Sequence, residues 1–256
     1  MVGGTILSAS GIFGSREKVI GYDTYKGIGS LDDVTRTDAI FVCVPTPTKG
    51  DAQDFSEVKN TLSELQKKKY SGIIIVKSTI VPGTMDELQE TYTSLDLAHN
   101  PEFLRERTCL EDFVNQKTVL VSSKSEKLLA RCEGVYSELY HDHPKPEMSL
   151  HLDFKTTEIA KYIHNTFLAT KVSFMNQVYE YCKDINTDYS SAVKAAVSQG
   201  VVGGSHTQVP GPDGQFGFGG ACFPKDTLAL LSTDSHGRLT ILKEATVYND
   251  AVRNKI

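Results

Sequence analysis

The sequence predicts an α/β protein in which a parallel-sheet domain precedes a smaller helical domain. Over the first two-thirds of the chain, short β-rich runs alternate with helical patterns, which is typical of a parallel, doubly wound sheet. After a polar, proline-bearing stretch at residues 141–146, the β-type runs stop and helical periodicity takes over. We therefore expect one domain at residues 1–146 and a second at residues 147–256.

The composition is that of an ordinary globular protein. The chain has 256 residues, with 27 Lys and Arg against 32 Asp and Glu. The formal net charge of −5 argues against a general nucleic-acid-binding protein, which carries a basic face. No apolar run approaches a spanning helix and no signal-peptide pattern opens the chain, so we expect no membrane segment and a cytoplasmic protein. The five scattered cysteines contain no CxxC, which favours reduced thiols over disulfides or a metal site.

The strands of the first domain are predicted from short apolar runs. Residues 19–22 are predicted to form a strand, and residues 5–10 before them are helix-like. Residues 40–44, 73–76 and 119–121 are continuous apolar runs, which are typical of buried parallel strands.

Helices are predicted between and after these strands. One helix, which Asp54 or Ser56 can cap, has apolar residues at the i, i+4, i+7 spacing of a single face, namely Val58, Leu62 and Leu65. Another follows the run at 119–121 and has its apolar positions at Leu128, Leu129, Val135 and Leu139. Strands and helices in this alternation imply helices packed on the faces of the sheet.

The second domain is predicted to be helical. Residues 153–184 contain no Gly or Pro and form one long central helix, and a second helix follows at residues 190–198. A glycine- and proline-rich loop occupies residues 200–220. Two more helices are predicted after this loop. One starts near Pro224, and the other extends over residues 239–252.

The long central helix carries apolar residues on more than one face. These residues are Ile159, Ile163, Phe167, Leu168, Val172, Phe174 and Val178. A helix that is apolar on several sides is buried on several sides. We therefore expect a homodimer in which this helix contacts a second subunit.

The N-terminal residues match part of a dinucleotide-binding unit. Such a unit has a strand, a G-x-G-x-x-G turn, a helix, and a second strand that ends in an acid about 20 residues on. Gly3 precedes a helix-like run, and Asp23 lies 20 residues after it. Gly3 would then be the third glycine, and Asp23 would accept hydrogen bonds from the adenosine ribose. The first strand and the first two glycines are absent, and an ordinary Asp at a strand end is the alternative.

The strongest chemical signal lies at residues 217–226, which read GFGGACFPKD. The glycines allow the backbone to approach a ligand closely. Cys222 comes just before a proline suited to the first turn of a helix. A helix N-terminus and a neighbouring lysine, here Lys225, favour the thiolate form and hence a nucleophile. Asp226 lies at i+4 from Cys222, so both residues can face one site. A buried cysteine in a tight turn is the alternative.

Five motifs in order carry a family resemblance. They are residues 42–48 (VCVPTPT), 77–84 (KSTIVPGT), 100–106 (NPEFLRE), 158–168 with Lys161 and Asn165, and 209–214 (VPGPDG) running into the cysteine segment. On these motifs the chain resembles the UDP-glucose/GDP-mannose dehydrogenase family nearly end to end. The resemblance implies a Rossmann-like NAD-binding domain, followed by a helical dimerisation domain that carries the catalytic cysteine.

The resemblance implies an enzyme that oxidises the C6 alcohol of a nucleotide sugar to a carboxylate in two NAD-dependent steps. UDP-glucose would give UDP-glucuronate, with the aldehyde held by Cys222 as a thiohemiacetal and then a thioester. Lys161 and Asn165, one helical turn apart, would stabilise the oxyanion. Glu102, Thr79 and Asp226 would orient and deprotonate the hydrolytic water. Mannose derivatives are the alternative sugars, as UDP-N-acetylmannosamine or GDP-mannose.

The family's binding residues carry over to this chain in two sets. The expected cofactor-binding residues are Gly3, Asp23, Thr46, Ser78, Thr79, Glu106 and Lys225. The expected substrate-binding residues are Glu102, Phe103, Leu104, Lys161, Asn165, Val209, Phe216 and Gly219. No metal is expected.

The chain also departs from the family pattern. Only 14 residues separate Asp23 from Asp38, where the family has a longer stretch. Val201 stands where the family often has an Arg that reaches into a neighbouring subunit. We expect a short form that lacks the first strand and the C-terminal UDP-binding domain. The alternative function is a truncated, non-catalytic homologue that assembles with a longer partner.

Overall fold

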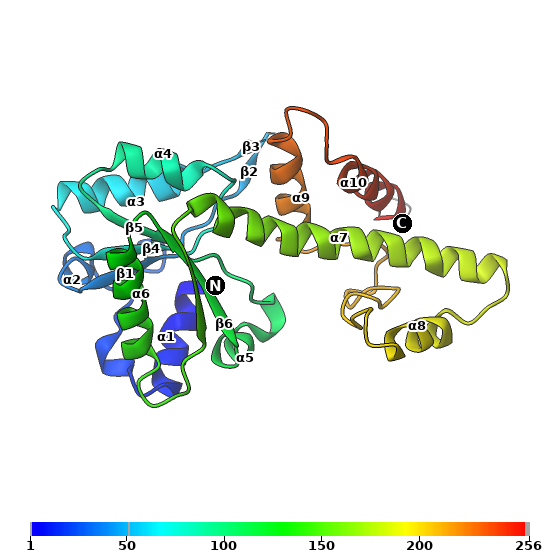
Figure 1. Ribbon diagram of the computed structural model, residues 1–256, viewed down its shortest axis with the longest axis horizontal. Coiled ribbons are helices and arrows are strands. Elements are labelled where there is room, and N and C mark those ends of the chain that lie inside the picture. The colour runs from blue at the N-terminus through cyan, green and yellow to red at the C-terminus, as the bar shows by residue number, and fades with distance from the viewer. Residues whose placement is uncertain (1, 51, 254–256) are drawn as a thin grey trace. The chain divides into compact units, whose positions relative to one another are not determined.

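The computed structural model describes residues 2–50 and 52–253, which form two compact units (Figure 1). The first unit contains the chain up to Pro47 together with Gln53–Lys161. The second contains Thr48–Ala52 and the chain from Tyr162 onward. Among the described residues, no helix is long and apolar enough to cross a membrane.

A five-stranded sheet in the order β1-β4-β5-β6-β7 forms the centre of the first unit. Its strands are β1 (Ala39–Val42), β4 (Ile73–Val76), β5 (Asp96–His99), β6 (Thr118–Ser123) and β7 (Glu147–His151). The first three run parallel, with Ala39 opposite Ile73 and Ile73 opposite Asp96, so their carboxyl ends lie at one edge of the sheet. The α/β class and the strands predicted from the three apolar runs are confirmed.

The sequence had led us to expect a parallel sheet, but one pair of neighbouring strands is antiparallel. β6 runs antiparallel to β5, with His99 opposite Ser122, and parallel to β7. The connection from β5 to β6 holds only the 3-10 helix η2 (Glu106–Thr108) and the six-residue helix α5 (Cys109–Val114). Because β6 is antiparallel to β5, the chain re-enters the sheet from the edge at which β5 ends.

Helices cover both faces of this sheet. Helices α1 (Val2–Ile12), α5 and α6 (Glu126–Leu139) pack on one face, and α3 (Ser56–Lys67) and α4 (Thr84–Thr91) pack on the other (Figure 1). Alternate β4 residues point to opposite faces, so Ile73 and Ile75 join the first core and Ile74 and Val76 the second. The predicted α3 core residues Val58, Leu62 and Leu65 are all buried.

The segment before β1 differs from the prediction. Residues 19–22 form no strand, and the chain there makes only an isolated bridge between Asp23 and Ile28. β-Type residues form a strand only where another strand pairs with them. Ile20 and Tyr22 are instead exposed, between η1 (Arg16–Lys18) and the short helix α2 (Leu31–Val34). The sequence analysis also missed β5, β7 and the two-residue strands β2 (Thr48–Lys49) and β3 (Ala52–Gln53).

The helical part of the chain follows the predicted order. The long helix α7 (Phe154–Asp184) begins in the first unit and continues in the second. It is followed by α8 (Tyr189–Ser198), an irregular loop, α9 (Phe223–Ser232) and α10 (Thr240–Arg253). The compact units divide after Lys161, whereas the expected domains divide after residue 146. The outer ends of the expected domains, Met1 and Ile256, lie outside the described residues.

Candidate active site

The predicted site residues divide between the two units. The first unit holds Gly3, Asp23, Thr46, Ser78, Thr79, Glu102, Phe103, Leu104, Glu106 and Lys161. The second holds Asn165, Val209, Phe216, Gly219, Cys222, Lys225 and Asp226. Within each unit, hydrogen bonds join several of these residues directly.

In the first unit, the loops after β1 and β4 are hydrogen-bonded to each other. The Thr46 hydroxyl donates to the Thr79 carbonyl at 2.7 Å, and the Ser78 hydroxyl donates to the Val44 carbonyl at 2.6 Å. The amide of Gln53, which the sequence analysis did not select, donates to the same Thr79 carbonyl at 2.8 Å. These bonds fix Thr46, Ser78 and Thr79 at the carboxyl edge of the parallel strands. In open α/β sheets, ligands bind outside this edge.

The segment after β5 brings three further predicted residues together. Glu102 is buried, and its Oε1 accepts a hydrogen bond from the backbone N–H of Phe103 at 2.9 Å. The ammonium of Lys161, on α7, donates to the carbonyl oxygen of Glu102 and lies 5.3 Å from the centre of the Phe103 ring. The next residue, Leu104, packs against the core. Residues 102–104 are therefore anchored to both α7 and the sheet.

A buried lysine that the sequence analysis did not select lies beneath these loops. Lys77 directly follows β4; its ammonium lies 3.0 Å from Glu102 Oε2 and donates to Asn100 Oδ1 at 2.6 Å. The signal was present in the sequence, because Lys77 continues a fully apolar run. A charged side chain that is buried in this way must be paired.

The first turns of α7 hold the β4 loop from another side. Glu158 accepts hydrogen bonds from the backbone N–H groups of Gly83 and Met85, at 2.6 and 2.8 Å. These donors lie at the start of α4, where a helix favours negative charge. Burial nevertheless raises the pKa of Glu158 above its ordinary value. The sequence analysis included Glu158 in a motif but gave it no role.

The residues present at the N-terminus fit part of an NAD site. Gly3 lies in the first turn of α1, and a Cβ atom added there would come within 3.6 Å of the Cys43 Cβ, just after β1. The third glycine of a dinucleotide fingerprint lies at such a contact between helix and strand. α1 therefore packs beside the end of β1 at an ordinary van der Waals distance, as in a dinucleotide-binding fold, without a steric need for glycine at this position.

Two other predicted cofactor residues have different surroundings. Asp23 ends no strand, which corrects the basis on which it was selected. Its Oδ1 accepts hydrogen bonds from the backbone N–H groups of Tyr25 and Lys26 at 3.0 and 3.1 Å, so it closes a turn. Glu106 is exposed in η2. The roles of both residues in cofactor binding stay predictions.

In the second unit, Cys222 occupies the N-cap position of α9 and is exposed. Its carbonyl oxygen accepts a hydrogen bond from the Asp226 backbone N–H at 2.8 Å, which closes the first turn. Pro224 lies in that turn, as predicted. The positive end of the helix dipole therefore faces the Cys222 position, where it favours an anion.

Asp226 is a buried carboxylate held by two neighbours. Its Oδ2 accepts from the Asn165 amide at 2.5 Å, and its Oδ1 lies 2.6 Å from the ammonium of Lys225. The exposed fraction of Asp226 is only 1%. The structure therefore joins three predicted residues from α7 and α9 next to the turn that carries Cys222.

The glycine-rich loop before Cys222 is held by side chains from two helices. Asn176 Oδ1, on α7, accepts from the Gly217 N–H at 3.0 Å, and Asn249 Oδ1, on α10, accepts from the Phe218 N–H at 2.5 Å. Gly217 has a φ of +72°, and a Cβ atom there would lie 2.4 Å from Asn249 Oδ1. Only glycine satisfies both the backbone conformation and this close approach.

Arg253 ties the same loop at three points. Its guanidinium donates to the carbonyl oxygens of Phe216 and Gly217, at 3.2 and 3.1 Å, and pairs with Asp213 at 2.8 Å. This hydrogen-bonded pairing lowers the pKa of Asp213. Val209, at the start of the loop, is half-buried. The sequence analysis missed Arg253 because its partners lie 36 to 40 residues away in the chain.

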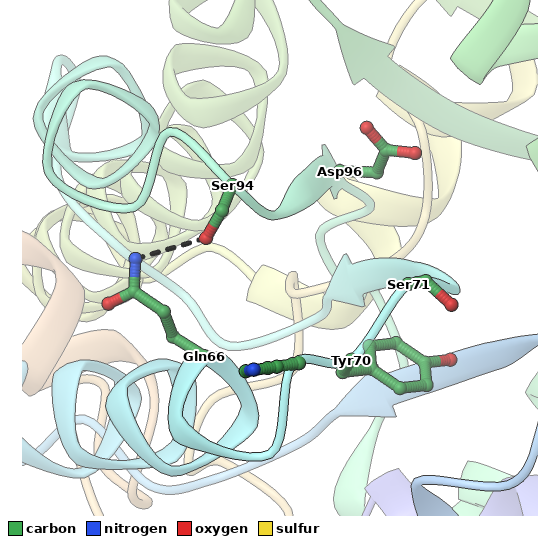
Figure 2. Close-up of a pocket in the computed structure, with 6 residues that line it drawn as sticks. Gln66, Tyr70, Ser71, Ser94 and Asp96 are labelled. Carbon is green, nitrogen blue, oxygen red and sulfur yellow. Dashed lines mark hydrogen bonds between the residues drawn. The ribbon is translucent and has the colours of Figure 1, made fainter.

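A cavity of about 390 Å³ lies away from these loops (Figure 2). It is lined by Gln66, Lys69, Tyr70, Ser71, Ser94 and Asp96. Figure 2 shows the Gln66 amide donating to the Ser94 hydroxyl, at 3.1 Å. The lining residues come just before β4 and at the start of β5, so the cavity is at the amino ends of these strands. It contains none of the predicted site residues.

Two family models match the chain. Residues 23–140 match the NAD binding domain of the UDP-glucose/GDP-mannose dehydrogenase family, and residues 155–251 match its central domain. A UDP-glucose 6-dehydrogenase of Rickettsia prowazekii is 35% identical over 205 residues, which cover 75% of this chain and 44% of the relative. One from Rhizobium meliloti is 32% identical over 226 residues, covering 84% of this chain and 50% of the relative.

Solved structures agree with these matches. A UDP-glucose dehydrogenase from Pyrobaculum islandicum is 28% identical with a TM-score of 0.73, over 86% of this chain and 52% of that one. A UDP-D-ManNAc dehydrogenase from Pyrococcus horikoshii, at 23% identity and a TM-score of 0.73, shares the fold over 87% of this chain and 52% of that one. The chain spans about half the length of the relatives it matches. NAD is the cofactor of these enzymes, and this chain belongs to the UDP-glucose/GDP-mannose dehydrogenase family.

Proposed function

We propose that this protein oxidises the C6 hydroxymethyl group of UDP-glucose to a carboxylate through a thioester on Cys222. The observation that carries the proposal is the arrangement in the second unit. An exposed cysteine begins α9, and the buried carboxylate of Asp226 lies one turn later, held by Asn165 and Lys225. NAD, when bound, would accept a hydride in each of the two oxidation steps.

Cys222 is the proposed nucleophile. Its thiolate adds to the C6 aldehyde and forms a thiohemiacetal, which keeps the aldehyde on the protein. Loss of the second hydride turns this adduct into a thioester. Water then attacks the thioester carbonyl, the C–S bond breaks, and the carboxylate and the free thiol are released.

The amide and ammonium groups on α7 are proposed to hold the substrate oxygen as it gains charge. Lys161 donates to the Glu102 carbonyl, and Asn165 uses one of its two amide hydrogens on Asp226. The Asn165 amide therefore has a second hydrogen to offer to a substrate oxygen. Donors that are already positioned stabilise a developing oxyanion without reorganisation.

Three groups are proposed to orient and deprotonate the hydrolytic water. They are the carboxylates of Glu102 and Asp226 and the hydroxyl of Thr79. A water that loses its proton as it attacks needs an acceptor already in place. Both carboxylates are buried and hydrogen-bonded, so they are held in one orientation.

The strand-edge residues of the first unit are proposed to contact NAD. Gly3 brings α1 close to the end of β1, and Thr46 and Ser78 are fixed at the carboxyl edge of the parallel strands. Asp23 is proposed to meet the adenosine ribose, which predicts a preference for NAD over NADP, because its carboxylate repels a 2′-phosphate. Steady-state comparison of the two cofactors tests this role, and a preference for NADP would contradict it.

The activity is tested by incubating the full chain with UDP-glucose and NAD. We expect two NADH per UDP-glucuronate released. Cys222→Ser should abolish net turnover, because removing a nucleophile that acts within a unit lowers the rate by several orders of magnitude. Cys109→Ser, a partly buried cysteine at the start of α5, is the matched control and should keep the activity. Full turnover by Cys222→Ser would disprove the mechanism.

The same assay separates the sugar alternatives. UDP-N-acetylmannosamine and GDP-mannose are offered in place of UDP-glucose, and the highest kcat/KM identifies the substrate. If the parent chain binds nucleotide sugars without turning any over, the non-catalytic alternative replaces this proposal.

We also propose that the protein forms a homodimer through α7. Three of the apolar residues predicted to be covered are more than half exposed, namely Ile163, Phe167 and Phe174 at 60, 66 and 57%. Tyr181 is also exposed, at 62%. It lies seven residues after Phe174, which lies seven residues after Phe167, so it extends the same stripe. Apolar stripes of this kind are buried when two helices pair. Sedimentation should show a dimer at micromolar concentration and a monomer for Phe167→Glu; Tyr25→Glu, at an exposed position of the first unit, is the control.

A further inference from the structure

The pair formed by Lys77 and Glu102 is the most deeply buried ion pair of the first unit among the described residues. Lys77 is 3% exposed and Glu102 is 8% exposed, with 3.0 Å between the ammonium and Oε2. The other carboxylate oxygen, Oε1, accepts from the Phe103 N–H at 2.9 Å. One oxygen thus faces a fixed positive charge and the other a fixed backbone donor. Together these contacts select a single orientation for the Glu102 side chain.

The lysine is itself held in place. Asn100 Oδ1 accepts hydrogen bonds from both the Lys77 ammonium and the Tyr136 hydroxyl, and Asn100 Nδ2 donates to the Leu120 carbonyl at 2.8 Å. Burial opposes the charge on Lys77, but the neighbouring groups, the Glu102 carboxylate foremost, together outweigh it, and the pKa of Lys77 lies above its ordinary value. The ammonium is therefore a permanent charge at working pH.

The other titratable groups that face this pair are uncharged at neutral pH. They are Cys43 after β1, His99 in β5, Tyr136 in α6, and Tyr140 just after it. Burial raises the pKa of Cys43 to about 12 and lowers that of His99 to about 3. Burial also raises the pKa of both tyrosines. Lys161 adds a second positive charge, on the carbonyl side of Glu102.

We propose that Lys77 is a positioning residue that holds Glu102 as an oriented carboxylate for the hydrolytic half of the reaction. This inference rests on the function proposed above, in which Glu102 handles the water that attacks the thioester. A buried carboxylate whose cation is removed is left uncompensated and can turn away. Lys77 prevents this, and Asn100 and Tyr136 keep Lys77 itself in place.

The contact with Lys77 makes the proposal testable through the hydrolytic step. Without Lys77, Oε2 of Glu102 loses the contact that orients it, so water should attack the thioester more slowly while the hydride steps continue. In Lys77→Met, kcat should therefore fall by about 10²-fold, the lower end of a general-base contribution, and mass spectrometry should show the thioester accumulating on Cys222. Lys77→Arg keeps the charge and should restore most of the parent rate.

Paired variants separate this role from a merely structural one. If Lys77 acts through Glu102, Lys77→Met should lower the rate in the parent background and change little in a Glu102→Gln background. Lys59→Met is the matched control, because Lys59 forms an exposed ion pair with Glu87 in the same unit, and it should leave the rate unchanged. A parent-like rate for Lys77→Met, or equal losses in both backgrounds, would overturn the inference.

A measurement without turnover completes the test. Carbon-13 NMR of labelled glutamate, assigned with Glu102→Gln, reports the surroundings of the Glu102 carboxylate at neutral pH, and we expect its resonance to move in Lys77→Met. If Lys77→Met does not fold, Lys77→Arg should keep the parent resonance and rate, and loss of either would overturn the inference. A parent chain that oxidises no nucleotide sugar would instead overturn the proposed function, whatever the Glu102 resonance does.

Discussion

The two units hold their candidate catalytic groups by different means. In the first unit, Thr79 and Glu102 lie just after parallel strands, whose paired backbones fix the places from which the loops leave. In the second unit, the side chains of Asn176, Asn249 and Arg253 hold the backbone of the loop before Cys222.

This difference predicts which substitutions each unit tolerates poorly. A strand-edge site tolerates changes in single side chains of its loops, because the sheet still directs the backbone, but it does not tolerate an unpaired buried charge. A loop held by side chains depends on each of those side chains and on glycines that leave room for them. Substitutions in the second unit should therefore change the chemistry or the loop directly.

The largest effect is expected at Asp226, which belongs to the proposed chemistry. Asp226→Asn keeps the shape of the side chain but removes its charge and one acceptor, between Asn165 and Lys225. We expect kcat to fall by about 10²- to 10⁴-fold, the usual contribution of a general base. Asp250→Asn, at an exposed position on α10, is the control and should retain full activity. A parent-like kcat for Asp226→Asn would remove Asp226 from the mechanism.

A smaller effect is expected on stability when the loop loses a required glycine. Gly217→Ala introduces a Cβ at a φ of +72° and 2.4 Å from Asn249 Oδ1. We expect the free energy of unfolding to fall by about 2 kcal/mol or more, because the backbone of residue 217 is strained and the Asn249 side chain is displaced. Gly214→Ala shares the positive φ, at +77°, but has no atom within 4 Å of the added Cβ. Urea unfolding should show the smaller loss for Gly214→Ala, and equal losses would show that the contact with Asn249 is unimportant.

The fold was predictable where its buried strands are apolar without interruption. Residues 73–76 show that pattern and form the fully buried strand β4. β5 was missed because Asp96 and His99 interrupt its apolar pattern, and β7 because its residues are mostly half-buried and vary between polar and apolar types. The strand predicted at residues 19–22 was wrong because local β propensity does not supply a pairing partner. The antiparallel direction of β6 leaves no mark on the periodicity of its own residues.

The candidate site was predictable where its residues lie in short motifs. Cys222, Lys225 and Asp226 fall within five consecutive positions, so a single segment identified them. Lys77 and Arg253 act through partners 23 to 40 residues away in the chain. Such partners become visible only once the strands and helices are assembled. A charge placed directly after a buried strand was the one local signal, and it could have pointed to Lys77 but not to its partner.

The smallest effect is expected from acid, at the ion pair between Asp213 and Arg253. The bond to Arg253 lowers the pKa of Asp213 in the folded chain, so the folded state binds this proton less readily than the unfolded state. The stabilisation is therefore present at neutral pH and is lost as the pH falls from the ordinary Asp value through the lowered one. Because Asp213 is 40% exposed, we expect a contribution below about 1 kcal/mol at pH 7. Urea unfolding of the parent and of Asp213→Asn measures it: the two should differ slightly at pH 7 and converge as the pH falls below the lowered pKa of Asp213. A difference that persists there would mean that Asp213 acts through the shape of the loop, as the glycines do, and not through its charge.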